Sequence, residues 1–401
     1  MRSNKPLKSR FHLGPSTLPQ PAARPYNHCM GKSVLKAAVA ALFLSAGPAH
    51  AEENEVIFNE LPYPVEMRLP GSQKAGAVLF ESRYSETAEA DYDTVLLQGE
   101  MPDPAIRLDV VVRANFFFPA DRRYKPERSR RFPGGRFWAR YRLDALTRQP
   151  LKFSVVNLDL KEDSTLTIYE TELLRSDSMS ETEEVLPSTF TYVPDPALSL
   201  PENIPFRLVR RAGWSAAAPT GPFTPHQPFY FTLHHTQAHY PGTYDRALAE
   251  MQFIQDFHQN GRGWIDIGYH FLIDPFGNIF EGRPISVVGA HVKYHNTGNI
   301  GISIMGSFHP PVSNIFTPGA KGSFLAVGTY LKDTYTVNRS SFYAHRDLGP
   351  TACPGDGLYA VMGTLRGLIF DPQPVPVPPA PELQPNAAQS KSLRQLINFY
   401  K

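Results

Sequence analysis

Hydrophobic and polar positions alternate through much of residues 54–173, and this pattern predicts β-strands. The runs RLDVVVRANFFF, RFWARYRL, LKFSVVNLDL and STLTIYETELL are rich in β-branched and aromatic residues, and clusters of Pro, Gly and Asp separate them. Many short strands with such punctuation are typical of a β-sandwich or jelly roll. We therefore expect an all-β, sandwich-like accessory domain over residues 52–173.

Two features of this region have both a functional and a structural reading. The basic run DRRYKPERSRR at 121–131 could touch an acidic polymer, although charge runs usually form solvated loops between strands. Phe137, Trp138 and Tyr141 could form a platform for sugars, although packing in a sandwich core is the more common role of such residues. We expect the structural role in both cases.

From residue 205 onward the pattern changes to strands that alternate with helices. This order predicts an α/β fold in which helices cover a central mixed sheet. We assign this domain to residues 206–370, with Thr243 as the N-cap of its first helix. The predicted elements are strands at 228–235, 267–274, 278–283 and 299–306, helices at 243–260 and 319–336, a strand in SFYAHR and a last helix opened by Pro354.

Residues 30–51 have the three parts of a secretory signal peptide. Lys32 and Lys36 supply its charged start, residues 37–46 its apolar centre, and residues 49–51 a small-residue cleavage site. The apolar run is too short to span a bilayer, and no later segment of the mature chain is a membrane candidate. We therefore expect an exported protein, periplasmic or secreted.

The remaining segments complete the expected organisation of the chain. Residues 1–51 form the leader, with Met30 as the expected start of translation. Residues 174–205 lose hydrophobic periodicity and are expected to form a linker, and residues 371–401 a Pro-rich stretch with a short tail.

Charge and composition narrow the function. The leader holds seven of the forty Lys and Arg and no Asp or Glu, which leaves 33 basic and 38 acidic residues, a net charge of −5, in the rest. A chain of that balance is a poor candidate for general nucleic-acid binding. Since the apolar share is 42%, the chain can form a folded core.

Imidazoles and a thiol are the first candidates for chemistry. A predicted strand ends at His234 and His235, a later strand ends at His345, and Cys353 lies just before the last helix. Neutral imidazole and thiolate are ligands that Zn²⁺ prefers, and a catalytic site uses three ligands plus water. Since neighbours on a strand face opposite ways, only one of the adjacent histidines can join the other two residues. A buried thiol beside a structural histidine is the alternative reading.

Several motifs together resemble a known family. VRRAGWSAAAP, FTLHHT, GWIDIGYHFLIDPFGNIFEGRP, VGAH, NTGNIGISIMGSF and AHRDLGPTACPGDGLY occur in this order within residues 207–370. They resemble the peptidoglycan recognition protein branch of the type 2 N-acetylmuramoyl-L-alanine amidases. Residues 52–200 and the tail lie outside the resemblance.

The resemblance implies a zinc hydrolase that cuts the amide between the lactyl group of N-acetylmuramic acid and L-Ala. It implies one Zn²⁺ held by His234, His345 and Cys353, which selects the first histidine of HHT. Tyr269 and Thr351 fall on the family's remaining catalytic positions.

The family resemblance indicates substrate-binding residues less directly than it indicates metal ligands. His291 matches a family position in the binding groove, and contact with glycan or peptide is one of its two readings. We place His235 as a second candidate for substrate binding, with a structural role as its alternative. Pro284-Ile285 replaces the dipeptide that is associated in animal members with the choice of the third stem residue, so stem specificity is not carried over.

Three functions follow from these observations. The leading hypothesis is an exported zinc amidase that acts on peptidoglycan or muropeptides. The second is a non-catalytic muropeptide receptor on the same fold. A third makes the β domain the main actor, as an adhesion or inhibitor-like module. The presence of all three ligands and Tyr269 favours the enzyme, and no pattern in the sequence predicts an oligomeric state.

Overall fold

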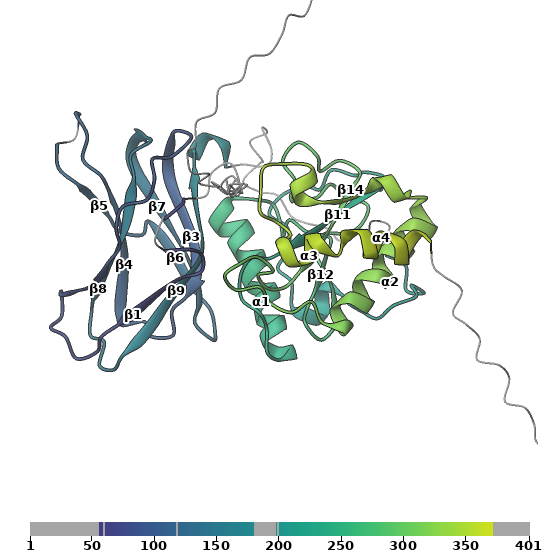
Figure 1. Ribbon diagram of the computed structural model, residues 1–401, viewed down its shortest axis with the longest axis horizontal. Helices are drawn as coiled ribbons and strands as arrows, with labels where there is room; N and C mark the ends of the chain where they lie inside the picture. Colours follow the sequence, from purple (N-terminus) through teal and green to yellow (C-terminus); the bar gives the residue numbers. More distant parts are fainter. Residues whose placement is uncertain (1–55, 59–60, 118, 180–197, 199, 372–401) are drawn as a thin grey trace, which may run out of the picture. The chain divides into compact units, whose positions relative to one another are not determined.

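The computed structural model describes residues 56–58, 61–117, 119–179, 198 and 200–371 (Figure 1). All of these residues belong to one compact unit, Gly47–Lys401. The predicted signal peptide, most of the predicted linker and the tail from residue 372 lie outside the described residues.

Residues 65–174 form nine antiparallel strands in two sheets. The strands are β1 (Val65–Leu69), β2 (Val78–Glu81), β3 (Tyr92–Glu100), β4 (Ile106–Val112), β5 (Arg122–Tyr124), β6 (Arg128–Arg131), β7 (Arg136–Thr147), β8 (Leu151–Asn157) and β9 (Ser164–Leu174). One sheet has the order β1-β9-β3-β7-β6 and the other β2-β8-β4-β5. Met67, Val110, Phe153 and Ile168, which come from both sheets, share one buried cluster. The two sheets therefore enclose a common core, as in a sandwich.

The structure corrects two expectations about these strands. The predicted run at 107–118 stops being a strand after Val112, and Phe116 and Phe117 are 93% and 81% exposed. Asn115 accounts for the stop, because its Oδ1 accepts a hydrogen bond from the Phe117 N–H at 3.0 Å and so favours a turn. The basic run at 121–131 is not a loop, since it contains β5 and β6.

The aromatic residues considered as a sugar platform are part of the interior. Phe137, Trp138 and Tyr141 are each at most 2% exposed. All three are too buried to stack on a sugar. Phe137 and Tyr141 pack in the sandwich core as expected, whereas Trp138 packs in a different cluster, with Met251 and Phe253.

A six-stranded mixed sheet lies at the centre of the later residues, with the order β10-β13-β12-β14-β11-β15. The strands are β10 (Leu208–Val209), β11 (Tyr230–His235), β12 (Phe271–Ile273), β13 (Ile279–Glu281), β14 (Asn299–Ile304) and β15 (Phe342–Ala344). β12 and β13 pair antiparallel, as the predicted hairpin requires, and the other pairs are parallel. The predicted α/β architecture is thus present.

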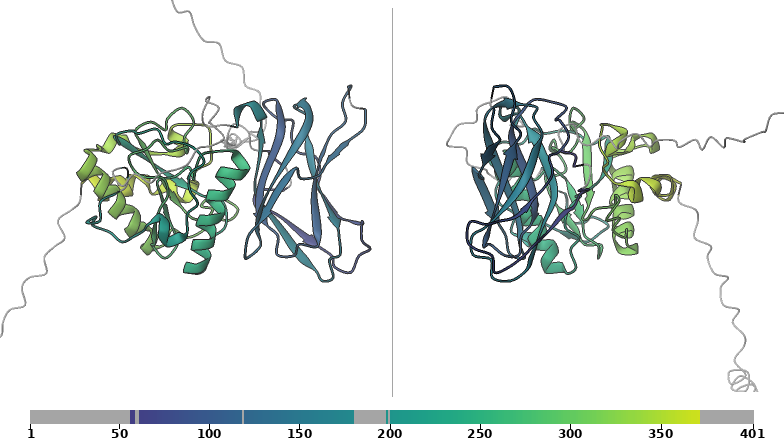
Figure 2. Two further views of the ribbon diagram at one scale, coloured as in Figure 1. Left: turned by 180° about the vertical axis from the view of Figure 1, so that it is seen from behind. Right: turned by 60° about the vertical axis from the view of Figure 1, so that its left-hand side comes forward.

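Helices cover this sheet on both faces (Figures 1 and 2). α2 (Pro318–Tyr335) and α4 (Met362–Phe370) pack with Phe231 and Ile302 in one cluster, whereas α1 (Tyr244–Asp256) packs with Leu272 and Phe280 in another. The Thr243 side chain caps α1 as predicted, accepting a hydrogen bond from the Arg246 N–H. Among the described residues, none of the helices combines the length and apolar character that a bilayer crossing requires.

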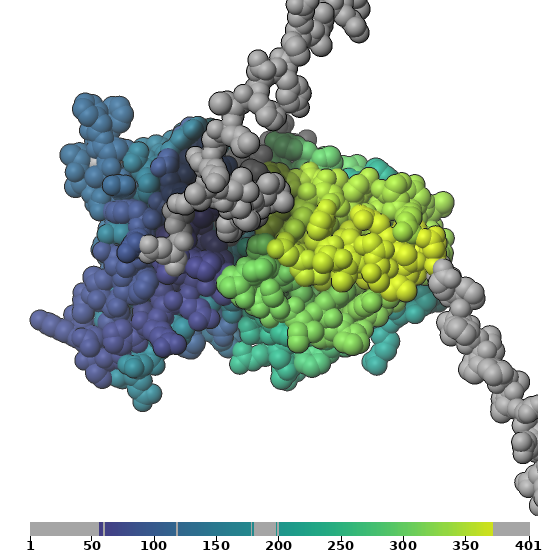
Figure 3. All heavy atoms as spheres, viewed as in Figure 1, coloured from purple at the N-terminus to yellow at the C-terminus, as the bar shows by residue number. Residues whose placement is uncertain are grey.

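Two helix ends differ from the prediction. The first helix does not run to residue 260 as a regular α-helix, because a π-helical turn, Phe257–Arg262, follows α1. The last helix is divided into α3 (Asp356–Ala360) and α4, and it begins two residues after Pro354. In the space-filling view these last helices, drawn in yellow, lie at the surface (Figure 3).

Buried contacts join the strand-rich region to α1. Leu96 of β3 and Trp138 of β7 belong to the same hydrophobic cluster as α1. Arg136 makes two hydrogen bonds of 2.8 and 2.9 Å to the Glu250 carboxylate, and the two side chains are only 6% and 1% exposed. The two predicted domains therefore share a core and a buried ion pair.

Candidate metal centre

Three side chains predicted as metal ligands meet at one edge of the mixed sheet. β11 and β15 are parallel, with Leu233 opposite Ala344, so the next residues, His234 and His345, leave the sheet at the same level. Cys353 comes from the loop before α3. One ligand atom from each residue lies within 4.8 Å of the other two.

The donor set fits a zinc ion. Nitrogen and sulfur ligands at their usual distances from tetrahedral zinc stand about 3.6 Å apart. His234 Nδ1 and Cys353 Sγ are separated by 3.6 Å. The His235 backbone N–H lies 3.4 Å from Sγ and donates to it, which favours the thiolate form that a metal needs.

Burial keeps the imidazoles of both candidate ligands neutral, as metal binding would require. It holds the pKa of His234 well below its usual range, with the nearby His345 adding to the effect. Burial also lowers the pKa of His345 to about 4. Both rings therefore present lone pairs at neutral pH.

His234 and His235 point to opposite sides of β11. The Nδ1 of His235 accepts a hydrogen bond from the Phe308 N–H at 3.2 Å, and burial lowers the pKa of this ring to about 3. His235 also lines a pocket that it shares with Cys353 and Tyr269. The choice between the adjacent histidines therefore falls on His234. The suggested contact of His235 with substrate stays a prediction.

The two predicted catalytic residues lie beside this group. The ring of Tyr269 is centred 5.3 Å from that of His234. Thr351 is buried, and its Oγ1 accepts a hydrogen bond from the Cys353 N–H at 3.1 Å. Thr351 thus shapes the turn that presents the thiol, and its catalytic role stays a prediction.

His291, the other candidate for substrate binding, is only 7% exposed. Its Nδ1 lies 3.0 Å from His234 Nε2, and its Nε2 lies 3.1 Å from the Asn299 carbonyl oxygen. Both ring nitrogens are thus engaged within the protein, and the suggested contact of His291 with substrate stays a prediction.

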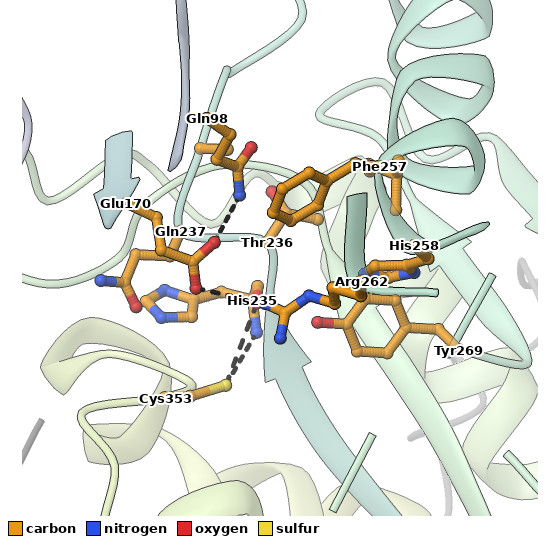
Figure 4. A pocket seen from close by; sticks show the side chains of 12 residues that line it. Gln98, Glu170, His235, Thr236, Gln237, Phe257, His258, Arg262, Tyr269 and Cys353 are labelled. Carbon is orange, nitrogen blue, oxygen red and sulfur yellow. Dashed lines mark hydrogen bonds and ion pairs between the residues drawn. The ribbon is translucent and has the colours of Figure 1, made fainter. Parts of the chain in front are cut away.

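A pocket beside the ligands includes residues that the sequence did not suggest (Figure 4). Cys353 and Tyr269 line it together with Gln98 of β3, Glu170 of β9 and Arg262. Figure 4 shows the Tyr269 hydroxyl and the Arg262 guanidinium pointing to the same part of this pocket. The strand-rich region therefore contributes polar groups to the wall of the candidate site.

The wall is held by ion pairs and an aromatic contact. Arg262 pairs with Glu172 and, at 3.5 Å, with Glu170, and its guanidinium lies 4.9 Å from the centre of the Trp264 ring. Gln98 Nε2 donates to the same Glu170 at 2.6 Å. No local pattern marks these residues, because they are far apart in the chain. Only the pairing of β3 with β9 and the turn after α1 bring them together.

Comparisons with known proteins identify sequence relatives of the region that contains His234, His345 and Cys353. Residues 224–356 match the family described as N-acetylmuramoyl-L-alanine amidase. Peptidoglycan-recognition protein SC2 of Drosophila melanogaster is 36% identical over 134 residues, which are 32% of this chain and 70% of that protein. Peptidoglycan recognition protein 1 of Bos indicus is 35% identical over 160 residues, or 39% of this chain and 82% of that protein.

Among solved structures, the N-acetylmuramoyl-L-alanine amidase LysC from Clostridium intestinale is similar at 28% identity and a TM-score of 0.33. That match covers 40% of this chain and 97% of the other. Three observations indicate the same family: the order of the motifs, the grouping of two histidines and a cysteine, and the sequence relatives. The chain belongs to the peptidoglycan recognition protein and type 2 amidase family.

Proposed function

We propose that this protein is an exported, zinc-dependent N-acetylmuramoyl-L-alanine amidase that hydrolyses the lactyl–L-Ala amide of peptidoglycan. The observation that carries the proposal is the convergence of His234, His345 and Cys353 within 4.8 Å. A chain that only bound muropeptides would have no need of a thiolate in this group.

The residues present have distinct roles in this reaction. A zinc ion bound there supplies Lewis acidity, which activates water as the nucleophile and polarises the scissile carbonyl. His234, His345 and Cys353 would hold the ion, and Nδ1 is the nitrogen of His234 that faces the thiol. Tyr269 donates its hydroxyl hydrogen to the charge that develops on the carbonyl oxygen. Thr351 fixes the turn before the cysteine.

Peptidoglycan or a muropeptide is the proposed ligand, because the sequence relatives are named for recognition of peptidoglycan. Gln98, Glu170 and Arg262 line the pocket next to Tyr269, where they would form a polar wall beside such a ligand while bonded to one another. Export rests on the signal-like residues 30–51 and is part of the proposal.

The test is digestion of purified sacculi with the full-length protein, followed by assays for free amines and for reducing sugars. An amidase releases L-Ala amino groups without new reducing ends. The matched control is His234→Asn, which removes one ligand. Binding to sacculi with no release of amines would instead identify a non-catalytic receptor.

A further inference from the structure

His291 stands next to the candidate ligand His234 and contacts the ring nitrogen that does not face the thiol. His234 has Nδ1 at 3.6 Å from Cys353 Sγ and Nε2 at 3.0 Å from His291 Nδ1. The two nitrogens of the His234 imidazole thus face different partners, the candidate metal site and a second histidine. The orientation and protonation of that ring therefore depend on His291.

The hydrogen bonds determine where the protons lie. The Asn299 carbonyl oxygen can only accept, so His291 Nε2, at 3.1 Å, carries the hydrogen. In a neutral imidazole the other nitrogen is then an acceptor, so His291 Nδ1 accepts from His234 Nε2–H. This leaves the lone pair of His234 on Nδ1, which is the nitrogen nearest the thiol.

The backbone around His291 leaves its ring little freedom. A Cβ added at Gly301 would lie 2.6 Å from His291 Cγ, and one added at Gly289 would lie 2.6 Å from His291 Cδ2. The His291 N–H also donates to Asn296 Oδ1 at 2.9 Å. Two glycines and a fixed backbone thus form a slot in which the imidazole stands in one orientation.

We propose that His291 is a positioning residue that holds His234 in the Nε2–H tautomer and directs its Nδ1 lone pair toward the metal. This inference rests on the proposed zinc site and is an alternative to the expectation that His291 contacts substrate. A metal-ligating histidine usually donates its other ring N–H to a carboxylate, a backbone carbonyl or water. That bond orients the ring and raises its basicity, and its loss costs about 10–100-fold in metal affinity. Here the acceptor in the same place is the His291 imidazole.

The first test compares zinc dissociation constants of full-length variants. His291→Phe keeps a ring in the slot but offers no acceptor, and we expect about 10–100-fold weaker zinc binding. His291→Asn places Oδ1 near the position of Nδ1, so we expect it to recover most of the lost affinity. Parent-like affinity in His291→Phe would overturn the proposal.

His226→Phe is the matched control. His226 is 8% exposed, with Nε2 at 3.0 Å from the Ile285 carbonyl oxygen and Nδ1 accepting from the Gly298 N–H at 2.8 Å. Like His291, His226 is a buried imidazole with one ring nitrogen beside a carbonyl oxygen and the other acting as an acceptor, but it makes no hydrogen bond to His234. Replacing His226 with Phe should therefore leave zinc affinity unchanged. An equal loss of affinity in both variants would show a general packing effect and would overturn the proposal.

A second measurement needs neither a variant nor bound zinc. ¹⁵N NMR of histidine-labelled, zinc-free protein should find the His234 proton on Nε2, and a proton on Nδ1 would overturn the assignment. If the parent bound no zinc, the proposed amidase function would fail, while this spectrum would still test the tautomer. The two failures are therefore distinguishable.

Discussion

Cys353 presents a sulfur that a serine would not replace as a metal ligand. Its sulfur lies 3.6 Å from His234 Nδ1 and accepts from the His235 N–H at 3.4 Å. A hydroxyl is a poor substitute for a thiolate ligand, so Cys353→Ser should lose most of its zinc and nearly all activity. Mass spectrometry of the purified protein gives the zinc content. One equivalent of zinc with normal turnover in the variant would show that the ligand set is wrong.

Tyr269 offers a second test at a single side chain. Tyr269→Phe keeps the ring beside His234 but removes the hydroxyl, so zinc content and KM should change little. A lost donor to developing negative charge typically costs about 10²–10³ in kcat. Steady-state kinetics on a soluble muropeptide separates the two constants. Tyr294→Phe, at an 88% exposed position, is the control and should behave as the parent.

The sequence predicted the grouping of His234, His345 and Cys353 better than its surroundings. Strand alternation limited the metal site to one of two adjacent histidines, and the family resemblance named His234 and Tyr269. Arg262 was missed because its ion pair with Glu172 joins residues 90 positions apart. The resemblance placed His291 in a binding groove, but the slot between Gly289 and Gly301 that holds its ring is created only by the fold.

At the scale of elements, the alternation of β11 gives a paired prediction. His234→Asn removes a side chain on the metal side of the strand, and His235→Asn removes one that meets the Phe308 backbone on the other side. We expect His234→Asn to lose zinc and His235→Asn to retain it. The reverse result in a zinc assay would mean that the site must be redrawn around His235.

Regular elements were predicted where local pattern decides them. α2 covers Pro318–Tyr335 against an expected 319–336, because amphipathic periodicity is a local property. The basic run at 121–131 was expected to form a solvated loop, but it forms strands, because some of its charges pair with residues on other strands. Arg123, for example, pairs with the buried Asp109 of β4 at 3.3 Å. Such compensation is invisible in a count of charges.

At the scale of the whole molecule, buried histidines link stability to pH. Burial holds the pKa values of His258 and His270 well below 6.5, and each Nδ1 accepts a backbone N–H at 3.0 Å. Below about pH 6.5 these histidines bind protons in the unfolded chain but stay neutral in the folded chain, so the free energy of unfolding falls as pH falls. Urea unfolding of zinc-free protein should give a lower free energy of unfolding at pH 5.5 than at pH 7.5, by about 1 kcal/mol per histidine. Greater stability at the lower pH would contradict this account.

The Arg136–Glu250 pair tests the contact between the strand-rich region and α1. Because both side chains are nearly inaccessible, Glu250→Ala leaves an uncompensated buried charge and should cost about 3–5 kcal/mol in urea unfolding. The double variant Arg136→Met, Glu250→Leu should be more stable than Glu250→Ala. Asp159→Ala, in an exposed pair with Lys161, is the control and should cost less than about 1 kcal/mol. Equal small effects at both sites would mean that the buried pair contributes little.

The hydrophobic cluster that joins Leu96 and Trp138 to α1 also affects how the molecule unfolds. If the strand-rich region unfolded alone, Phe253 and Phe257 of the cluster would lose their cover, and Glu250 would lose its partner. The reverse opening would uncover Leu96 and Trp138 in the same way. Since each half loses part of its core with the other, we expect the two regions to unfold together in one urea transition. A chain cut back to residues 206–370 would keep the core between the mixed sheet, α2 and α4, but it should expose the part of the shared cluster that Leu96 and Trp138 cover.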